Sequence, residues 1–167
     1  MKIISVTKGQ HVVVDDADYE FLSQWKWAAA YSPYTQTFYA MRTYMPKGRR
    51  GKKLSIRMHR QIVGCVKGMD VDHINGNTLD NRRGNLRICT RGENSRNQKT
   101  RSSNSSGYKG VSWDINREKW SARIMRDGKT VNIGRFTSLD QAALAYNDAA
   151  LAYHGPYAKL NKVAVPN

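Results

Sequence analysis

Two adjacent residues, Asp72 and His73, combine a carboxylate with an imidazole, and two asparagines, Asn85 and Asn94, follow them. On an extended backbone, neighbouring side chains point to opposite sides, so Asp72 and His73 can serve different parts of one site. A neutral imidazole can activate water as a general base near pH 7. Carboxylate and amide oxygens suit a hard divalent cation. This set therefore suits metal-assisted hydrolysis.

The segment around these residues has the pattern of a strand, a loop, a short strand and a helix. The helix start has capping-box spacing, with Thr90 as N-cap and Glu93 three residues later. This order would bring Asp72, His73 and Asn94 together. A purely structural alternative stays open for the Asp-His pair, because Asn-Gly-Asn and Arg-Arg-Gly-Asn are also turn sequences.

The charge of the chain is strongly positive and unevenly distributed. The formal net charge is +15 over 167 residues, of which residues 41–106 carry +12. Residues 1–40 carry −1 and residues 107–167 carry +4. The positive field therefore surrounds the candidate site, so a polyanion is the expected partner and its affinity should fall steeply with salt. No basic amphipathic helix favours a membrane surface instead.

The cysteines and histidines have no spacing typical of a structural zinc site. Cys65 and Cys89 form no Cys-x-x-Cys pair, and the four histidines are scattered. We therefore expect no structural zinc, and two cysteines that pack as small core side chains. The sequence has no signal-peptide pattern and no stretch of transmembrane length. We expect an intracellular protein.

The spaced set Asp72, His73, Asn85 and Asn94 resembles the HNH, or ββα-metal, nuclease finger, here at about residues 69–97. The resemblance implies that His73 is the general base and that Asp72 and Asn94 hold one Mg²⁺ or Mn²⁺. It also implies that Asn85 braces the loop and orients the imidazole. Many members of the family have a histidine in place of Asn94, but homing nucleases of the phage type have asparagine there.

The segment before the finger is expected to be rich in strands. Residues 3–6 and 11–14 are β-branched runs separated by a turn sequence, and acidic residues open a short helix from residue 15 to about residue 25. Residues 38–45 and 54–58 read as two strands joined by a basic hairpin tip. We expect Trp25 and Trp27 to be core or half-buried residues.

This layout resembles the N-terminal part of phage HNH homing nucleases, in which such a strand pair can lie along DNA. The basic tip is therefore expected to contact DNA through Arg49, Arg50, Lys52 and Lys53. His59 begins a short helix before the finger. We expect it to be structural or to contact a phosphate, and not to act as a second base.

The remainder of the chain has the pattern of a separate module. Residues 98–106 have the composition of a flexible linker. Three strands are predicted at residues 108–113, 119–126 and 129–136, with an Asp-Gly hairpin signal before the third. A helix is predicted at residues 138–153, with small residues on the stripe that would face the sheet.

This module resembles the APETALA2-type DNA-binding domain of plant ethylene-response factors. The matches are Gly107-Tyr108-Lys109-Gly110-Val111, Trp120-Ser121-Ala122, Ile133-Gly134-Arg135-Phe136 and the run from Ala142 to Ala150. In that family the sheet enters the major groove of DNA. The resemblance places these residues at DNA-facing positions: Lys109, Ser112, Arg123, Met125, Thr130 and Asn132. Several arginines of the family are replaced here, so the plant recognition sequence is not expected to carry over.

Together these patterns predict an α+β chain with an HNH nuclease domain at residues 1–97, a linker at 98–106 and an APETALA2-type domain at 107–161. The resemblance implies a metal-dependent, site-specific homing endonuclease of a phage, bacterium or mobile intron, acting on double-stranded DNA. One finger cuts one strand, so a monomer, which we favour, should nick. The alternative is a non-catalytic DNA-binding regulator. An RNA-binding protein is disfavoured, since the sheet lacks paired stacking aromatics.

Overall fold

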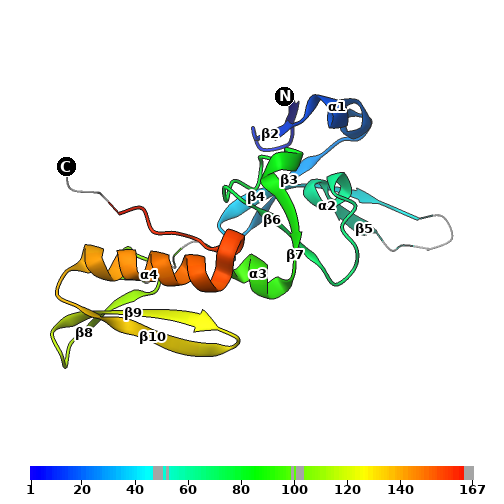
Figure 1. Ribbon diagram of the computed structural model, residues 1–167. Helices are drawn as coiled ribbons and strands as arrows, with labels where there is room; N and C mark the ends of the chain where they lie inside the picture. The colour runs from blue at the N-terminus through cyan, green and yellow to red at the C-terminus, as the bar shows by residue number, and fades with distance from the viewer. Residues whose placement is uncertain (47–50, 52, 99, 101–103, 164–167) are drawn as a thin grey trace. The chain divides into compact units, whose positions relative to one another are not determined.

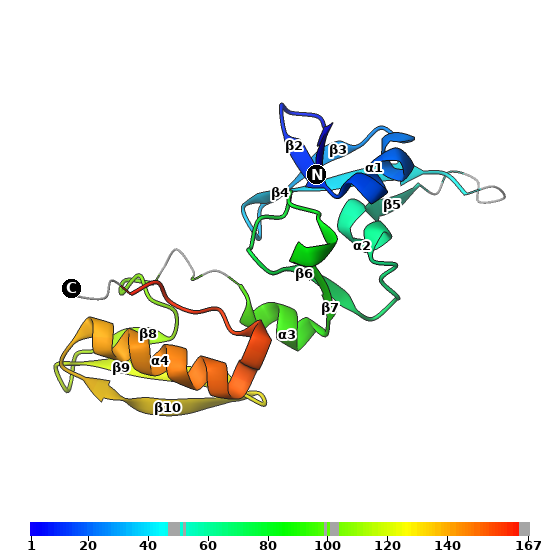
Figure 2. The same cartoon turned by 45° about the horizontal axis from the view of Figure 1, so that its top comes forward.

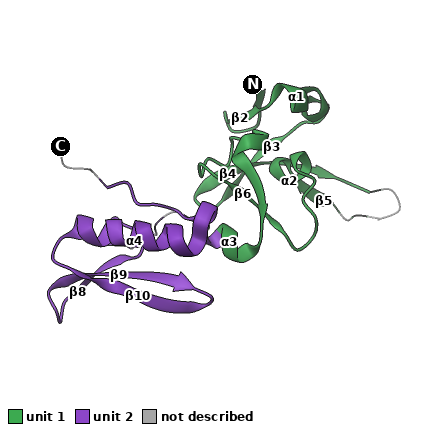
Figure 3. Ribbon diagram, viewed as in Figure 1, with its two compact units in different colours: residues 1–94 green, residues 95–167 purple. Residues whose placement is uncertain are grey.

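The chain divides into two compact units, residues 1–94 and 95–167 (Figure 3). The computed structural model describes residues 1–46, 51, 53–98, 100 and 104–163. Helices alternate with several small antiparallel sheets, which confirms the predicted α+β class. In the part of the chain that is described, no helix is both long and apolar enough to cross a membrane.

The first unit opens with a hairpin of two short strands, β1 (Lys2–Ser5) and β2 (His11–Val14). The β-branched residues predicted this hairpin, and its turn contains Lys8 and Gly9 in the left-handed region, at φ 60° and 64°. Helix α1 (Asp16–Ser23) follows, with acidic residues in its first turn where they oppose the helix dipole. The helix ends two residues earlier than predicted.

A three-stranded antiparallel sheet comes next, with β4 (Thr37–Tyr44) between β3 (Ala28–Ser32) and β5 (Leu54–Arg57). Strands β4 and β5 were predicted, but β3 was not. Its first three residues are alanines, which have little intrinsic preference for strands. Tertiary contacts set its conformation, because Ala29 is buried and its amide donates to Thr7 Oγ1 at 2.9 Å.

The finger consists of a two-stranded sheet and a helix (Figure 1). Strand β6 (Asp70–His73) pairs with β7 (Leu86–Cys89), and a short 3-10 turn, η1 (Arg83–Asn85), leads into β7. Helix α3 (Arg91–Arg96) follows. The predicted capping box is present. Thr90 Oγ1 accepts from the amide of Glu93, and the Glu93 carboxylate accepts from the Thr90 amide at 2.8 Å.

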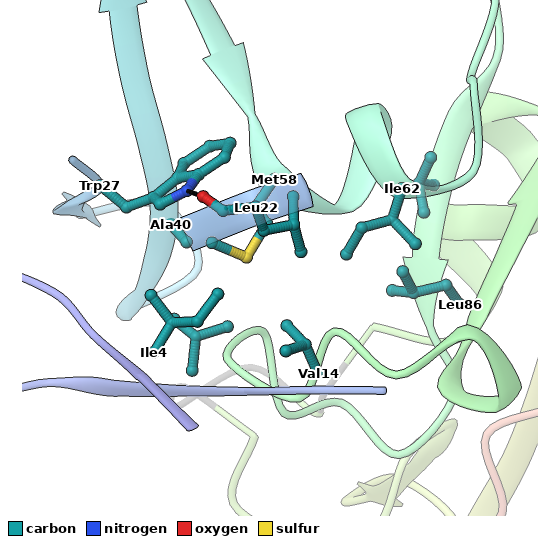
Figure 4. Close-up of a cluster of buried hydrophobic side chains, with 10 residues drawn as sticks. Ile4, Val14, Leu22, Trp27, Ala40, Met58, Ile62 and Leu86 are labelled. Atoms are coloured by element: carbon teal, nitrogen blue, oxygen red, sulfur yellow. Dashed lines mark hydrogen bonds between the residues drawn. The ribbon is translucent and has the colours of Figure 1, made fainter. Parts of the chain in front are cut away.

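One hydrophobic core joins the N-terminal elements to the finger (Figure 4). Helix α2 (Met58–Ile62) contributes both of its terminal residues to this core. Trp27 is also buried here, as predicted, and its indole Nε1 donates to the Leu22 carbonyl at 2.8 Å. The cluster comprises Ile4, Val12, Val14, Leu22, Trp27, Ala40, Met58, Ile62, Val71 and Leu86. Because it includes residues of β6 and β7, the finger does not have a core of its own.

The second unit is a three-stranded antiparallel sheet packed against one long helix (Figure 2). Strands β8 (Val111–Asp114), β9 (Lys119–Arg126) and β10 (Lys129–Phe136) lie in the order β10-β9-β8. Helix α4 (Leu139–His154) packs on the sheet and continues into the turn η2 (Gly155–Tyr157). The predictions for β9 and β10 match the structure and that for α4 is one residue early at each end, whereas β8 begins three residues later than predicted.

Local sequence explains the ends of these elements. The β9–β10 turn contains Asp127 and Gly128, both with positive φ, as the Asp-Gly signal predicted. Ser138 caps α4 by accepting from the amide of Gln141. Small residues on α4 allow close packing on the sheet, and the buried set is Val111, Ala122, Ile124, Ala142, Ala143, Tyr146 and Ala150.

The backbone of Gly110 lies directly against the ring of Tyr146 in this core. Its φ is +75°, and a Cβ atom there would lie 2.2 Å from the ring of Tyr146. Its carbonyl accepts from the amide of Arg123 at 2.8 Å. Only glycine can combine this conformation with this contact.

Candidate active site

Strand β6 separates two sets of polar side chains by its alternation. Asp70 and Asp72 lie on one face of the strand, while Val71 and His73 lie on the other. Asp72 is buried and stands opposite Arg87 of β7 in the hairpin register. Nε and Nη2 of Arg87 both donate to Oδ2 of Asp72, at 2.8 and 2.5 Å. The charge of Asp72 is therefore compensated by a guanidinium within the fold.

Helix α3 brings an amide to the same face of β6. Nδ2 of Asn94 donates to Oδ2 of Asp70 at 3.2 Å. Asp70 was not predicted as part of the site, but it precedes Asp72 by two residues and so shares its face. The face thus offers carboxylate and amide oxygens, which are the donors that Mg²⁺ and Mn²⁺ prefer.

This donor set is sparse for a metal site. Across the described ranges, no group of three or more His, Cys, Asp or Glu residues could hold a metal ion. Mg²⁺ is commonly bound through one or two carboxylates, with water and substrate phosphate completing its octahedron. The residues present fit such an ion in donor chemistry, with Arg87 as the cation that competes for Asp72.

His73 faces away from the carboxylates and contacts a side chain that the sequence did not single out. Its Nε2 lies 2.9 Å from Oδ1 of Asn81, and both residues are buried. An amide oxygen can only accept, so this contact favours the tautomer of His73 in which Nε2 carries the hydrogen and Nδ1 carries the lone pair. Asn81 thereby favours Nδ1 as the basic nitrogen of His73.

Two aromatic rings pack beside His73. The ring centroid of His59 lies 5.0 Å from that of His73, and the ring of Tyr39 lies 6.3 Å away. Burial lowers the pKa of His59 to about 3. Burial also lowers the pKa of His73, while the hydrogen bond with Asn81 and the nearby carboxylates act to raise it. Both imidazoles are therefore neutral at pH 7. Nδ1 of His59 has no hydrogen-bond partner among the residues that the structure describes.

Asn85 holds the loop that joins β6 to β7. Its Nδ2 donates to the Asp80 carbonyl at 2.7 Å, and its Oδ1 accepts from the Asn75 amide at 2.9 Å. Its own carbonyl accepts from the amide of Ile74 at 2.9 Å. These bonds fix the backbone that follows His73.

The same loop is also tied to the N-terminal elements. Asp80 forms a β-bridge with Val13, and the Asn81 amide donates to the Val13 carbonyl at 2.8 Å. Arg83 forms a bidentate ion pair with Asp18 of α1 at 2.7 and 2.8 Å. The position of Asn81 beside His73 therefore depends on residues about 65 positions earlier in the chain.

In the second unit, most of the predicted DNA-facing side chains lie on the sheet face away from α4. Arg123, Met125, Thr130 and Asn132 are exposed there, as is Ser112 of β8. Strand pairing places Asn132 opposite Arg123 and Thr130 opposite Met125.

Lys109 has a different environment from the other predicted DNA contacts. Its Nζ donates to the carbonyls of Arg96 and Gln98, at 2.5 and 2.8 Å. Burial lowers its pKa to about 8. Nearby, Ser106 donates from Oγ to the Val111 carbonyl at 2.8 Å, so the end of the predicted linker is bonded to the module. At the basic tip, Lys53 is exposed, whereas these residues lie outside the described ones: Arg49, Arg50 and Lys52.

Asp70, Asn81 and Arg87 are the neighbours of the site that sequence reasoning missed. A signal for Arg87 existed, because an antiparallel hairpin with Asp72 and Arg87 opposed pairs their charges. Asn81 carried no signal beyond its place in a turn-rich run.

Comparisons with known proteins agree with the two units. Residues 54–96 match the family model for an HNH endonuclease, and residues 106–156 match that for an AP2 domain. Protein 3.8 of Escherichia phage T7 is 40% identical over 93 residues, which cover 56% of this chain and 76% of that protein. An uncharacterized HNH endonuclease, L560, of Acanthamoeba polyphaga mimivirus is 30% identical over 162 residues, covering 93% of this chain and 77% of that protein.

A ββα finger with an acid, a histidine and two asparagines, joined to a sheet-type DNA-binding module, defines a class of DNA-acting nucleases. This chain belongs to the HNH endonuclease family and also carries an AP2-type DNA-binding domain. The comparisons point to a nuclease and DNA-binding role, in a family that generally uses a divalent metal.

Proposed function

We propose that this chain is a metal-dependent endonuclease that hydrolyses a phosphodiester of double-stranded DNA at a preferred site. The observation that carries the proposal is the pairing of His73 with Asn81. This contact supports Nδ1 as the basic nitrogen of a buried imidazole whose pKa burial lowers. A general base needs this state, because a protonated ring could not accept a proton from water.

In the proposed reaction, His73 Nδ1 takes a proton from water as the water oxygen attacks phosphorus. The bond from phosphorus to the 3′ oxygen of the preceding sugar would break, leaving 3′-hydroxyl and 5′-phosphate ends by analogy with the family. Asp72 and Asn94 would hold one Mg²⁺ or Mn²⁺, which when bound stabilises charge on the phosphate and the leaving oxygen. Arg87, which pairs with Asp72, would have to share that carboxylate.

Asn85 has a supporting role in this proposal, because its hydrogen bonds hold the backbone on both sides of the loop after His73. The AP2-type sheet would supply recognition of the DNA sequence. One finger per chain supports a nick in one strand by a monomer. The relatives in a bacteriophage and a giant virus support a viral or bacterial setting.

A plasmid assay tests the proposal. Supercoiled DNA is incubated with the full chain in Mg²⁺, in Mn²⁺ or in EDTA, and nicked and linear products are separated on a gel. We expect nicked circles with either metal and none in EDTA. Binding without nicking in every metal tested would favour the alternative, a DNA-binding regulator.

A further inference from the structure

The outward face of the AP2-type sheet carries an arginine that simple strand alternation would have turned inward. Strand β10 contains a bulge between Asn132 and Gly134. Before the bulge, Asn132 pairs with Arg123; after it, Arg135 pairs with Ser121. Because directly paired residues share a face, Arg135 lies on the same outer face as Ser121 and Arg123.

Arg135 is anchored across the full width of the sheet. Its Nε donates to Oδ2 of Asp114 at 2.9 Å, although β10 and β8 are separated by β9. Between them lies Ser121, which is 1% exposed despite being on the outer face. Its small side chain stands opposite Arg135 of β10 and accepts from Arg123 of its own strand, so two long side chains flank it.

A second guanidinium is fixed at the same place. Nε of Arg123 donates to Oγ of Ser121 at 3.2 Å. Arg123 and Arg135 are thus both held through Nε. Neither makes a hydrogen bond from its terminal Nη atoms to any residue within the described ranges. The side chain of Arg135 is 32% exposed, so its end is open to a partner.

We propose that Arg135, anchored by Asp114, reads a guanine in the DNA target, and that Arg123 reads a second guanine at most two base pairs away. This inference rests on the proposed role of the sheet in DNA recognition. Two parallel Nη–H groups match the O6 and N7 acceptors of guanine in the major groove. Diagonal neighbours on a sheet are about 7–8 Å apart, which corresponds to about two base-pair steps of 3.4 Å.

The anchoring carboxylate favours a base over a phosphate as the ligand of Arg135. Asp114, which Arg117 also approaches, offsets part of the positive charge of Arg135 and weakens its attraction to a phosphate. A guanine edge is neutral overall and presents only acceptors there. Asp114 also reduces the side-chain freedom that Arg135 loses on binding, which strengthens a directional contact.

The test compares binding preferences of full-length variants. Duplexes from a randomised library are selected in EDTA, so that recognition is measured without cleavage. Arg135→Ala should lose a guanine preference at one position, by about 5- to 150-fold. Arg123→Ala should lose it at a second, nearby position. Asp114→Ala should weaken the first preference, and Asp114→Asn, which keeps an acceptor, should restore most of it.

Arg117→Ala is the matched control. Arg117 also approaches Asp114, at 3.6 Å, but comes from the turn and is 59% exposed. It should leave both preferences unchanged. Thermal melting of every variant checks that the sheet is intact.

Three results would overturn the inference. If Arg135→Ala weakens binding equally for all sequences and lowers its salt dependence, the residue contacts a phosphate. If it changes nothing, the Asp114 pair is only a surface ion pair. If the full chain selects no guanine, the inference fails, while nicking of plasmid by the full chain would still uphold the proposed endonuclease.

Discussion

The finger and the AP2-type sheet place their polar residues in opposite environments. In the finger, Asp72, His73 and Asn85 are less than 9% exposed and bonded to neighbours. On the sheet, Arg123 and Asn132 are exposed. Catalysis needs groups whose positions are fixed before the substrate arrives, whereas recognition needs groups that a partner can reach. Changes in the finger should therefore affect both stability and turnover, and changes on the sheet should affect binding alone.

The largest effect is expected from removing the proposed base. His73→Ala should lower the nicking rate by about 10²- to 10⁴-fold, because general-base catalysis contributes that much. DNA affinity should change by less than about tenfold, since the base activates water and adds little to ground-state binding. Single-turnover nicking and a binding titration measure the two quantities.

His11→Ala is the control, because His11 is an exposed histidine of β2 in the same unit. It should retain full activity. Near-normal nicking by His73→Ala would place the base elsewhere, and His59 would be examined next.

The proposed metal-binding residues should be the next most sensitive. Asp72→Ala should raise the Mg²⁺ concentration needed for half-maximal nicking by about 10- to 100-fold, and Asn94→Ala should do so less, because only Asp72 supplies a formal charge. Asp72→Ala also removes the carboxylate that pairs with Arg87, so the melting temperature of this variant should fall.

The double variant Asp72→Ala, Arg87→Leu separates the two effects. It should regain stability without regaining metal activation. If metal activation returned with stability, Asp72 would be a structural residue only.

Substitutions of Asn81 test whether turnover depends on the tautomer of His73. Asn81→Leu should lower turnover by about 10- to 100-fold with little change in DNA affinity, whereas Asn81→Asp keeps an acceptor and should retain most activity. Long-range ¹H–¹⁵N spectra of histidine-labelled protein report which ring nitrogen of His73 carries the hydrogen. A protonated Nε2 in both variants would mean that Asn81 does not select the tautomer.

A substitution on the outer face of the AP2-type sheet is expected to change DNA discrimination and leave stability unchanged. Asn132→Ala should lower the discrimination between preferred and scrambled duplexes by about fivefold, the lower end of the range for one base contact. Its unfolding free energy should stay within about 0.5 kcal/mol of the parent, because exposed positions contribute little to stability. A large loss of stability would contradict the comparison between the two units.

The smallest effect at neutral pH is expected at His59. Its pKa falls from the ordinary value near 6.5 to about 3 on folding, so between these values the unfolded chain binds more protons. Stability is therefore retained above pH 6.5 and lost as pH falls below it, with a slope of up to about 1.4 kcal/mol per pH unit from this group.

Urea unfolding between pH 4 and 7 measures this slope. His59→Phe keeps an aromatic ring without a titrating group and should flatten the curve. An unchanged slope would mean that other groups cause the loss of stability in acid.

Sequence patterns predicted the elements whose residues repeat with a clear period, such as β9, β10 and α4. They could not predict β3, because burial and a contact with Thr7 outweigh the weak strand preference of its alanines. The same limit applies to the sites. Asp72 and His73 stand out by type, whereas the roles of Asn81 and Arg135 depend on a long-range bridge and a one-residue bulge. Neither feature has a periodic signature.

The ties between the finger loop and the N-terminal segment bear on how such a nuclease can be transferred between proteins. The HNH match begins at residue 54, yet the loop inside it is bonded to Val13, Asp18 and Phe38. A fusion protein that receives only the matched segment would acquire the proposed catalytic residues without the elements that hold their loop in place. Gene exchange that preserves cutting would therefore have to carry the first 94 residues as one inherited block.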